Sequence, residues 1–394
     1  MLKKMLMCFC LFAYMLGVSA GTDGVVEDNK KGDVAVKNLM RAMTLLDNTI
    51  DKCFKGSDLH MCDLYHLGNG RQEGTADVWP YTAAMEAVNG VMEALQALKG
   101  NCPELYAKNM ERYKCLMARL FDNLDYYKGT YTLTSYTQTK EWSVYGVHRS
   151  NTKGTAKVEG IENVYDDQMW LVRELVRAYR NTGEKRYLVE AEYLADYVID
   201  GWDCTLDANG HENGGITWGP GYNSKHSCSN APIISPLVWL SQIYKDSKDK
   251  AVWRYVAADG KRKSKKISKH DLYLMFAEKV YEWQKRKLMN EKTGCYWDML
   301  GADGKMRYEN VGGKRYRANV PNGGPVGTQF TYNSGTMLCG AVDLLQVTGS
   351  NVYRTDLTQL AKATYLNFRG KARTIDGTAH YPFPYDRDTR HGFN

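Results

Sequence analysis

Apolar side chains recur along this chain with the period of an α-helix. In the stretch 184–200, EKRYLVEAEYLADYVID, they fall at Tyr187/Leu188, Ala191, Leu194/Ala195 and Val198/Ile199. Spacings of three and four residues place such side chains on one helical face. The same pattern predicts further helices over 35–50, 79–99, 103–124, 164–180, 229–246, 270–289, 328–346 and 353–368.

The predicted helices are of two kinds. Those at 79–99, 164–180, 229–246 and 328–346 are apolar on most sides, whereas 103–124, 184–200 and 270–289 are amphipathic and charged. Alternation of the two kinds indicates an all-α fold with two layers and the apolar helices inside. Only KGTYTLTSYT, residues 128–137, alternates like a β-strand, and it is one short piece.

The first twenty residues, MLKKMLMCFCLFAYMLGVSA, have the layout of a secretory signal. Lys3 and Lys4 precede an apolar run that ends in small residues at Ala20. The run is too short to cross a membrane comfortably. We therefore predict a signal peptide over 1–20 and an exported product without a stable membrane anchor. No Pro/Ser-rich linker divides the remainder, so we predict one domain over 21–394.

Charge and cysteine content narrow the possible partners. The formal charge of +7 is mild, and much of it comes from KRKSKKISK, residues 261–269. No aromatic residue interrupts that run, so a solvated loop is favoured and no nucleic-acid partner is expected. Export permits disulfides, and Cys53 with Cys62 or Cys102 with Cys115 lie near enough in sequence to pair, although spacing leaves the pairing open. Neither spacing is typical of a metal site.

Two adjacent carboxylates stand out in ENVYDDQMWLV, where Asp166 and Asp167 are surrounded by apolar and aromatic residues. A helix N-terminus stabilises one ionised carboxylate, and that charge raises the pKa of a neighbouring acid. One ionised and one protonated acid is the pair that glycoside cleavage requires. Alternatively, the two residues only cap the helix.

Aromatic residues favour the catalytic interpretation over capping. Trp79, Trp170, Trp202 and Trp218 fall in or beside the loops that precede the apolar helices, together with several Tyr, Asn and Gly residues. Sugar rings stack on aromatic side chains, while amides and carboxylates bind their hydroxyl groups. These loops therefore indicate a carbohydrate site.

Three segments resemble glycoside hydrolase family 76, the α-1,6-mannanases. They are NVYDDQMWLVRELVRAYRNTGEKRYLVEAEYLADYVI, GGITWGPGYNSKHSCSNAPIISPLVWLSQIY and QFTYNSGTMLCGAVDLLQVTG, in that order. The resemblance implies an (α/α)6 barrel and a retaining endo-α-1,6-mannanase of yeast-type mannan, periplasmic or secreted. We expect no cofactor, no metal and a monomer.

Residue by residue, Asp166 matches the family's nucleophile and Asp167 its general acid/base. Net retention requires the two carboxyl groups to lie about 5–5.5 Å apart, which suits adjacent aspartates at a helix end. The residues expected to bind substrate are those that the loops and the resemblance bring together. They are Trp79, Tyr165, Trp170, Trp218, Asn230, Tyr332 and Asn333.

Some alternatives stay open. A complete barrel of this kind has six helix pairs, and the pattern predicts fewer helices, so either helices at the ends escape the pattern or the barrel is incomplete at its C-terminus. Another carbohydrate-active enzyme on the same fold is possible, but lyases and epimerases use His, Tyr or Arg as bases, and the Asp166 loop has no histidine. A non-catalytic glycan-binding protein would not need the aspartate pair.

Overall fold

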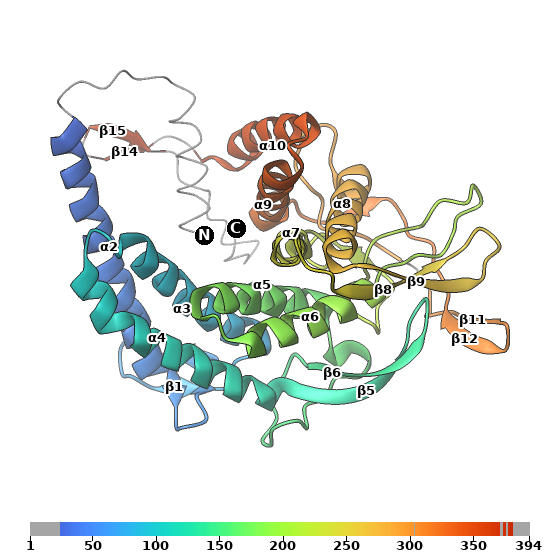
Figure 1. Ribbon diagram of the computed structural model, residues 1–394, viewed down its shortest axis with the longest axis horizontal. Coiled ribbons are helices and arrows are strands. Elements are labelled where there is room, and N and C mark those ends of the chain that lie inside the picture. Colours follow the sequence, from blue (N-terminus) through green and yellow to red (C-terminus); the bar gives the residue numbers. More distant parts are fainter. Residues whose placement is uncertain (1–23, 303, 371–372, 376, 381–394) are drawn as a thin grey trace. The chain divides into compact units, whose positions relative to one another are not determined.

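The computed structural model describes residues 24–302, 304–370, 373–375 and 377–380 (Figure 1). The predicted signal peptide over 1–20 lies outside the described residues. The chain divides into two discontinuous compact units. Unit 1 comprises Met1–Gly129, Tyr145–Lys157 and Arg177–Leu188, and unit 2 comprises Thr130–Val144, Val158–Val176 and Val189–Asn394. One catalytic domain over 21–394 stays a prediction.

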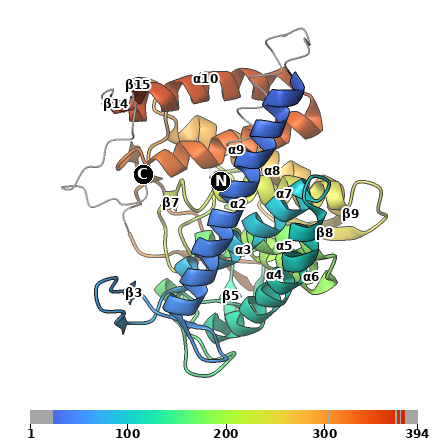
Figure 2. The same ribbon diagram turned by 90° about the vertical axis from the view of Figure 1, so that its left-hand side faces the viewer.

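Unit 1 is built around three helices, α2 (Gly24–Cys53), α3 (Val78–Leu98) and α4 (Pro103–Leu124). Helices α3 and α4 pack against each other, as Figure 2 shows. Their contact is apolar because each contributes one buried stripe, formed by Met85, Val88 and Met92 from α3 and Tyr113, Met117 and Leu120 from α4.

Short elements complete unit 1 after α2. Two small antiparallel pairs follow it, namely β1 (Phe54–Lys55) with β2 (His60–Met61) and β3 (Leu64–Tyr65) with β4 (Gln72–Glu73). The 3-10 turn η1 (Asp125–Tyr127) follows α4. All eight cysteines of the described residues, among them Cys53 and Cys62, carry free thiols.

Residues 128–200 form two strands and two helices. Strands β5 (Lys128–Thr134) and β6 (Thr139–Tyr145) pair with each other, and helices α5 (Tyr165–Thr182) and α6 (Lys185–Asp200) follow the turn η2 (Gly160–Glu162). The apolar pattern of 184–200 predicts most of the buried face of α6, since Tyr187, Leu188, Ala191, Leu194, Ala195 and Val198 are buried. Ile199 is only partly buried, and Tyr197 is buried although the pattern did not include it.

Unit 2 contains the remaining helices. They are α7 (Ile234–Ile243), preceded by the turn η3 (Ala231–Ile233), then α8 (Lys269–Leu288), α9 (Thr331–Thr348) and α10 (Asn351–Phe368). Helix α7 packs against both α8 and α9, and α9 packs against α10 (Figure 2). Every residue from Ile234 to Ser241 is buried, which explains why this stretch has no polar face.

Strands are more numerous than the sequence predicts. The hairpins β8 (Lys250–Val256) with β9 (Arg262–Ser268) and β11 (Tyr308–Val311) with β12 (Lys314–Arg317) were not anticipated. The pair β14 (Arg373–Ile375) with β15 (Thr378–His380) follows α10. The prediction of a loop over 261–269 is wrong, because most of this basic run is β9. Its seven residues pair in register with β8, a contact that a local pattern does not reveal.

The predicted helices are confirmed. Nine α-helices lie within the described residues, one at each expected position. None of these described helices combines the length and the apolar character that crossing a membrane requires.

Candidate active site

The first turn of α5 carries the aspartate pair. The backbone N–H of Tyr165 donates to the carbonyl of Trp218 at 2.8 Å, which satisfies one N–H group of the helix start and fixes its position. Asp167 is only 7% exposed. Asp166 keeps some exposed surface, but its Oδ1 atom is buried. The two acids therefore lie at a helix N-terminus in a largely buried setting within unit 2.

Burial controls the acidity of Asp166. It raises the pKa of this carboxyl to about 6. The neighbouring Cys228 thiol, Trp218 indole and backbone N–H groups of Asp166 and Asp167 favour the ionised form and oppose the rise in pKa. With a pKa of about 6, Asp166 is mostly ionised at neutral pH.

The indole of Trp218 lies beside Asp166 but has ring neighbours of its own. His226 stacks on it with 4.9 Å between ring centroids and 22° between planes, and the Tyr222 ring lies 4.7 Å away. Burial lowers the pKa of His226 to about 4, so this ring is neutral at pH 7. Because two rings pack against Trp218, we infer that it offers the site its N–H group and not an open stacking face.

Two buried polar atoms beside the aspartate pair are available to bond a ligand. Neither Asp166 Oδ1 nor Trp218 Nε1 has a hydrogen-bond partner within the described residues. Buried polar groups in proteins are nearly always bonded. A sugar hydroxyl could satisfy both an acceptor and a donor placed in this way.

A small sheet holds the surrounding loops in place. Strands β7 (Lys225–His226), β10 (Met299–Leu300) and β13 (Pro325–Val326) form three antiparallel strands with β10 in the centre. The N–H of Ser227 donates to the carbonyl of Asp298 at 2.7 Å and extends the pairing by one residue. The sheet therefore brings together three loops that are far apart in sequence.

A buried ion pair anchors β7. Lys225 Nζ lies 2.8 Å from Asp203 Oδ2 and donates to the Gly214 carbonyl at 2.6 Å, and the two charged side chains are 3% and 1% exposed. The other carboxylate oxygen of Asp203 accepts from the Thr205 backbone N–H and hydroxyl. Burial lowers the pKa of Lys225, and the Asp203 charge opposes this. The pair is thus fully bonded.

Asp298 is a third carboxyl near the pair, and the sequence pattern does not reveal it. Tyr332 has Cys228, Asp298 and Asp166 as its charged or ionisable neighbours, and burial together with these groups raises its pKa. Cys228 likewise has both Asp166 and Asp298 as neighbours. The only signal in the sequence is an acid among the apolar and aromatic residues of CYWDML. Among the described residues, no group of three or more His, Cys, Asp or Glu side chains is arranged to hold a metal ion.

Tyr332 has Asp166 among its ionisable neighbours, and its contact with substrate stays a prediction. It is the second residue of α9, and its ring stacks on Phe330 with 5.2 Å between centroids and 10° between planes. Both side chains keep partial exposure. Trp170, one helical turn after Asp166, is also partly exposed, and the Arg173 guanidinium lies 5.1 Å from its ring centroid. Trp79 is 42% exposed and belongs to unit 1.

Of the two asparagines, Asn230 needs a different interpretation from substrate contact. Asn230 is fully buried, and its side chain bonds the Ile216 N–H and carbonyl and the His226 carbonyl at 2.8–2.9 Å. It therefore closes the loop 216–230 and has no surface left for a ligand. Asn333 is also buried, with Nδ2 at 3.5 Å from the Trp297 carbonyl. We propose that Asn230 positions its loop. Asn333 Oδ1 has no hydrogen-bond partner among the described residues, so contact of Asn333 with substrate stays a prediction.

Tyr165 is likewise internal, at 1% exposure. Its ring lies 5.0 Å from that of Tyr197, whose hydroxyl donates to Asn163 Oδ1 at 3.0 Å and lies 2.7 Å from the Tyr131 hydroxyl. This buried group supports the loop that leads into α5. We therefore propose that Tyr165 orients the aspartates and does not touch the sugar.

Two glycines allow the Trp218 loop to approach α5. A Cβ atom on Gly219 would lie 2.4 Å from the Asn163 carbonyl oxygen, and one on Gly221 would lie 2.5 Å from the Gly160 carbonyl. Any other residue would push the two loops apart. The segment TWGPGYN thus has a steric reason for its glycines, in addition to the turn that they make.

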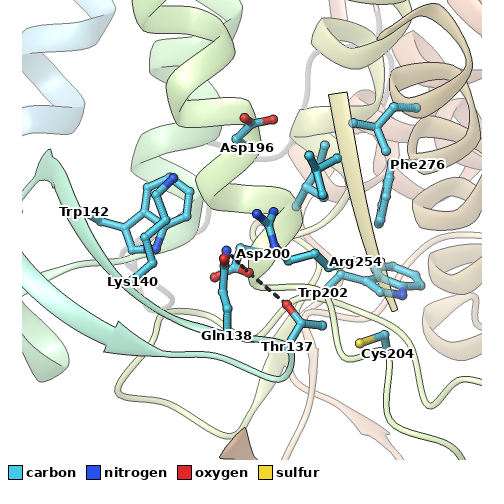
Figure 3. Close-up of a pocket in the computed structure, with 13 residues that line it drawn as sticks. Thr137, Gln138, Lys140, Trp142, Asp196, Asp200, Trp202, Cys204, Arg254 and Phe276 are labelled. Atoms are coloured by element: carbon cyan, nitrogen blue, oxygen red, sulfur yellow. Dashed lines mark hydrogen bonds between the residues drawn. The ribbon is translucent and has the colours of Figure 1, made fainter. Parts of the chain in front are cut away.

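A small cavity in unit 2 is separate from this chemistry. It measures about 40 Å³ and lies at the end of α6, where Asp200 accepts from Thr137 Oγ1 at 3.2 Å and Gln138 Nε2 at 3.0 Å (Figure 3). Trp202, expected near the loops of the site, lines it. Such a volume suits one or two water molecules and not a sugar ring. The cavity is therefore not the substrate site.

Comparisons with known proteins identify the family. The sequence model of glycosyl hydrolase family 76 matches residues 81–257 and 265–390. The comparison with curated proteins found no match.

Solved structures agree on the fold. A family 76 glycoside hydrolase from a bovine Bacteroides thetaiotaomicron strain matches with a TM-score of 0.59 and 19% identity, over 88% of this chain and 60% of that chain. A family 76 mannosidase from B. thetaiotaomicron matches with a TM-score of 0.56 and 20% identity, over 87% of this chain and 76% of that chain. A third match is an inactive α-1,6-mannanase variant of Salegentibacter, in which two adjacent aspartates are replaced by asparagine and α-1,6-mannotriose is bound. Its TM-score is 0.50 and its identity 20%, over 87% of this chain and 72% of that chain.

This chain therefore spans 60% of the length of the first of these structures. The likeness in fold confirms the predicted fold class, and the sequence match covers more than half of the residues. The chain belongs to glycosyl hydrolase family 76 and has the mainly helical fold of its (α/α)6 members.

Proposed function

We propose that this protein is a retaining, endo-acting glycoside hydrolase that cleaves α-1,6-mannosidic linkages in mannan. One observation carries the proposal: Asp166 and Asp167 share the first turn of α5 in a largely buried, ring-lined site. The Salegentibacter structure supports it, because that α-1,6-mannanase variant is inactive with two adjacent aspartates replaced. The membership of family 76 supports the class of reaction.

In the proposed reaction, ionised Asp166 attacks the anomeric carbon while Asp167 gives its proton to the leaving glycosidic oxygen. A covalent mannosyl–Asp166 ester forms as the glycosidic bond breaks. Asp167, now ionised, takes a proton from water, and the resulting hydroxide displaces the ester. The product keeps the anomeric configuration of the substrate, because each of the two displacements inverts it.

The neighbouring groups suit these steps. The Cys228 thiol and the Trp218 indole stabilise the ionised form of Asp166. The Tyr332 hydroxyl, whose pKa is raised, stays protonated and can donate to the substrate. We also propose export through the N-terminal segment to the periplasm or the medium, because residues 1–20 have the layout of a secretory signal.

The product pattern tests this function directly. Purified protein is expected to release a ladder of oligosaccharides from linear α-1,6-mannan and to leave α-1,2- and α-1,3-linked mannooligosaccharides intact. Proton NMR of the first products should show the α-anomer before mutarotation. A first product in the β-configuration would overturn the retaining mechanism, and no products at all would favour a glycan-binding protein.

The pH profile tests the role of Asp166. We expect kcat/KM to fall below an apparent pKa near 6, because protonation removes the nucleophile and Asp166 has a pKa of about 6. Replacing Cys228 by alanine removes a group that lowers this pKa, so the acidic limb should move to higher pH. Cys228→Ser keeps a donor and serves as the matched control, with a limb close to that of the wild type. If the acidic limbs of Cys228→Ala and Cys228→Ser lie at the same pH, the thiol does not lower the pKa of Asp166.

A further inference from the structure

The basic run of 261–269 has no part in the aspartate site, and its position in the fold calls for another explanation. It forms β9, opposite β8, in a two-stranded hairpin of unit 2 (Figure 1). The family match stops at 257 and resumes at 265, so the hairpin tip lies outside the part that the family model covers. The tip is therefore a feature of this chain beyond the matched segments.

Pairing brings aromatic residues next to the basic ones. Trp253 stands opposite Lys265, and Tyr255 stands opposite Lys263. Lys265 Nζ lies 4.5 Å from the centroid of the Trp253 ring, and the two aromatic rings lie 4.8 Å apart. The interleaving of rings and cations that the sequence run lacks is thus supplied by the neighbouring strand.

A second hairpin also places basic side chains next to an aromatic ring. On β11 and β12, the Arg315 guanidinium lies 3.9 Å from the centroid of the Tyr308 ring, and Lys314 is exposed beside it. Arg262 at the start of β9 pairs with Glu309 on β11, which joins the two hairpins. We call the exposed cations of residues 261–266 and 307–315 the basic surface; it comprises Lys261, Lys263, Lys265, Lys266, Arg307, Lys314 and Arg315.

Few acids neutralise this surface. Asp259 lies 3.7 Å from both Lys261 and Lys263. Within the part of the chain that the structure describes, no carboxylate forms an ion pair with Lys265 or Lys266. Lysines on an edge strand also discourage pairing with other chains, but that role would not require a second basic hairpin.

We propose that the basic surface binds an acidic polysaccharide, one that carries carboxylate, sulfate or phosphate groups. Charge complementarity points to a polyanion. Proteins that bind single-stranded nucleic acids offer open ring faces to the bases, whereas here Lys265 and Arg315 lie over the rings of Trp253 and Tyr308. The choice of a polysaccharide rests on the proposed hydrolysis of mannan. The basic surface would hold the enzyme on acidic polysaccharides that surround its neutral substrate.

Binding by the full chain tests this proposal. At low salt, wild-type protein is expected to bind dextran sulfate and polygalacturonate but not unmodified dextran, and to lose this binding at high salt. The variant K263Q/K265Q/K266Q should bind about tenfold more weakly. The matched control K108Q/K185Q/K292Q removes three exposed lysines elsewhere and should bind as the wild type does.

Three results would overturn the proposal. The first is a wild-type protein that does not bind the acidic polysaccharides. The second is an equal loss of binding in the two triple variants, which would indicate only an effect of net charge. The third is single-stranded DNA binding as tightly as the acidic polysaccharides. These probes are not α-mannans, so the result does not depend on whether the protein cleaves mannan. Hydrolysis of neutral linear α-1,6-mannan should be unchanged in K263Q/K265Q/K266Q.

Discussion

Replacing Asp166 by asparagine is expected to lower kcat on linear α-1,6-mannan by roughly three orders of magnitude or more, and Asp167→Asn should do the same. The amide keeps the size of the side chain but can neither attack the anomeric carbon nor exchange a proton. Neither residue can replace the other, because one must be ionised when the other is protonated. Initial rates of reducing-sugar release measure the effect.

The controls separate chemistry from folding. Asp246 is exposed and lies outside the site, so Asp246→Asn should retain full activity. Circular dichroism should show unchanged helix content in all three variants. The aspartate variants should also still bind mannooligosaccharides in calorimetry. Activity near that of the wild type in either Asp166→Asn or Asp167→Asn would remove the catalytic assignment.

Replacing Lys225 by methionine should destabilise the protein by about 3–5 kcal/mol, since it leaves the buried Asp203 charge without its partner. Lys225 Nζ bonds both Asp203 and the Gly214 carbonyl, and both charged side chains are almost fully buried. Urea denaturation followed by circular dichroism measures the change in the free energy of unfolding.

An exposed ion pair provides the contrast for this prediction. Lys261 lies 3.7 Å from Asp259, and both side chains are largely exposed. Lys261→Met should therefore change the free energy of unfolding by less than about 1 kcal/mol. The double variant Lys225→Met/Asp203→Leu should recover part of the loss, because no unpaired charge remains. If Lys225→Met and Lys261→Met lower the free energy of unfolding equally, burial of the Lys225–Asp203 pair is not the cause of the loss.

The helices could be predicted from the sequence because their signal is local. Each amphipathic helix repeats its apolar residues every three or four positions, and α6 buries most of the face that this pattern marks. Helix α7 was recognisable for the opposite reason, as a stretch with no polar face. The hairpins were missed because strand pairing joins distant residues. β9 is mostly charged, and its apolar and aromatic partners are on β8.

The site was predictable in part. The position of Asp166 and Asp167 at a helix start followed from the residues around them. Asp298 could not be found in this way, since it reaches the pair only through the pairing of β10 with β7 and β13. Asn230 was assigned to the substrate because amides bind hydroxyl groups, whereas its side chain bonds the backbone of its own loop.

The three-stranded sheet has a consequence for how the site is assembled. Its strands are two residues long and lie at 225–226, 299–300 and 325–326, so each pairing closes a loop of tens of residues for very few hydrogen bonds. Helices form early from neighbours in sequence, and contacts of this range form late. The same sheet should open locally before the helices melt. Catalytic competence would then be the last property gained on folding and the first lost on heating, while helix content still reports a native protein.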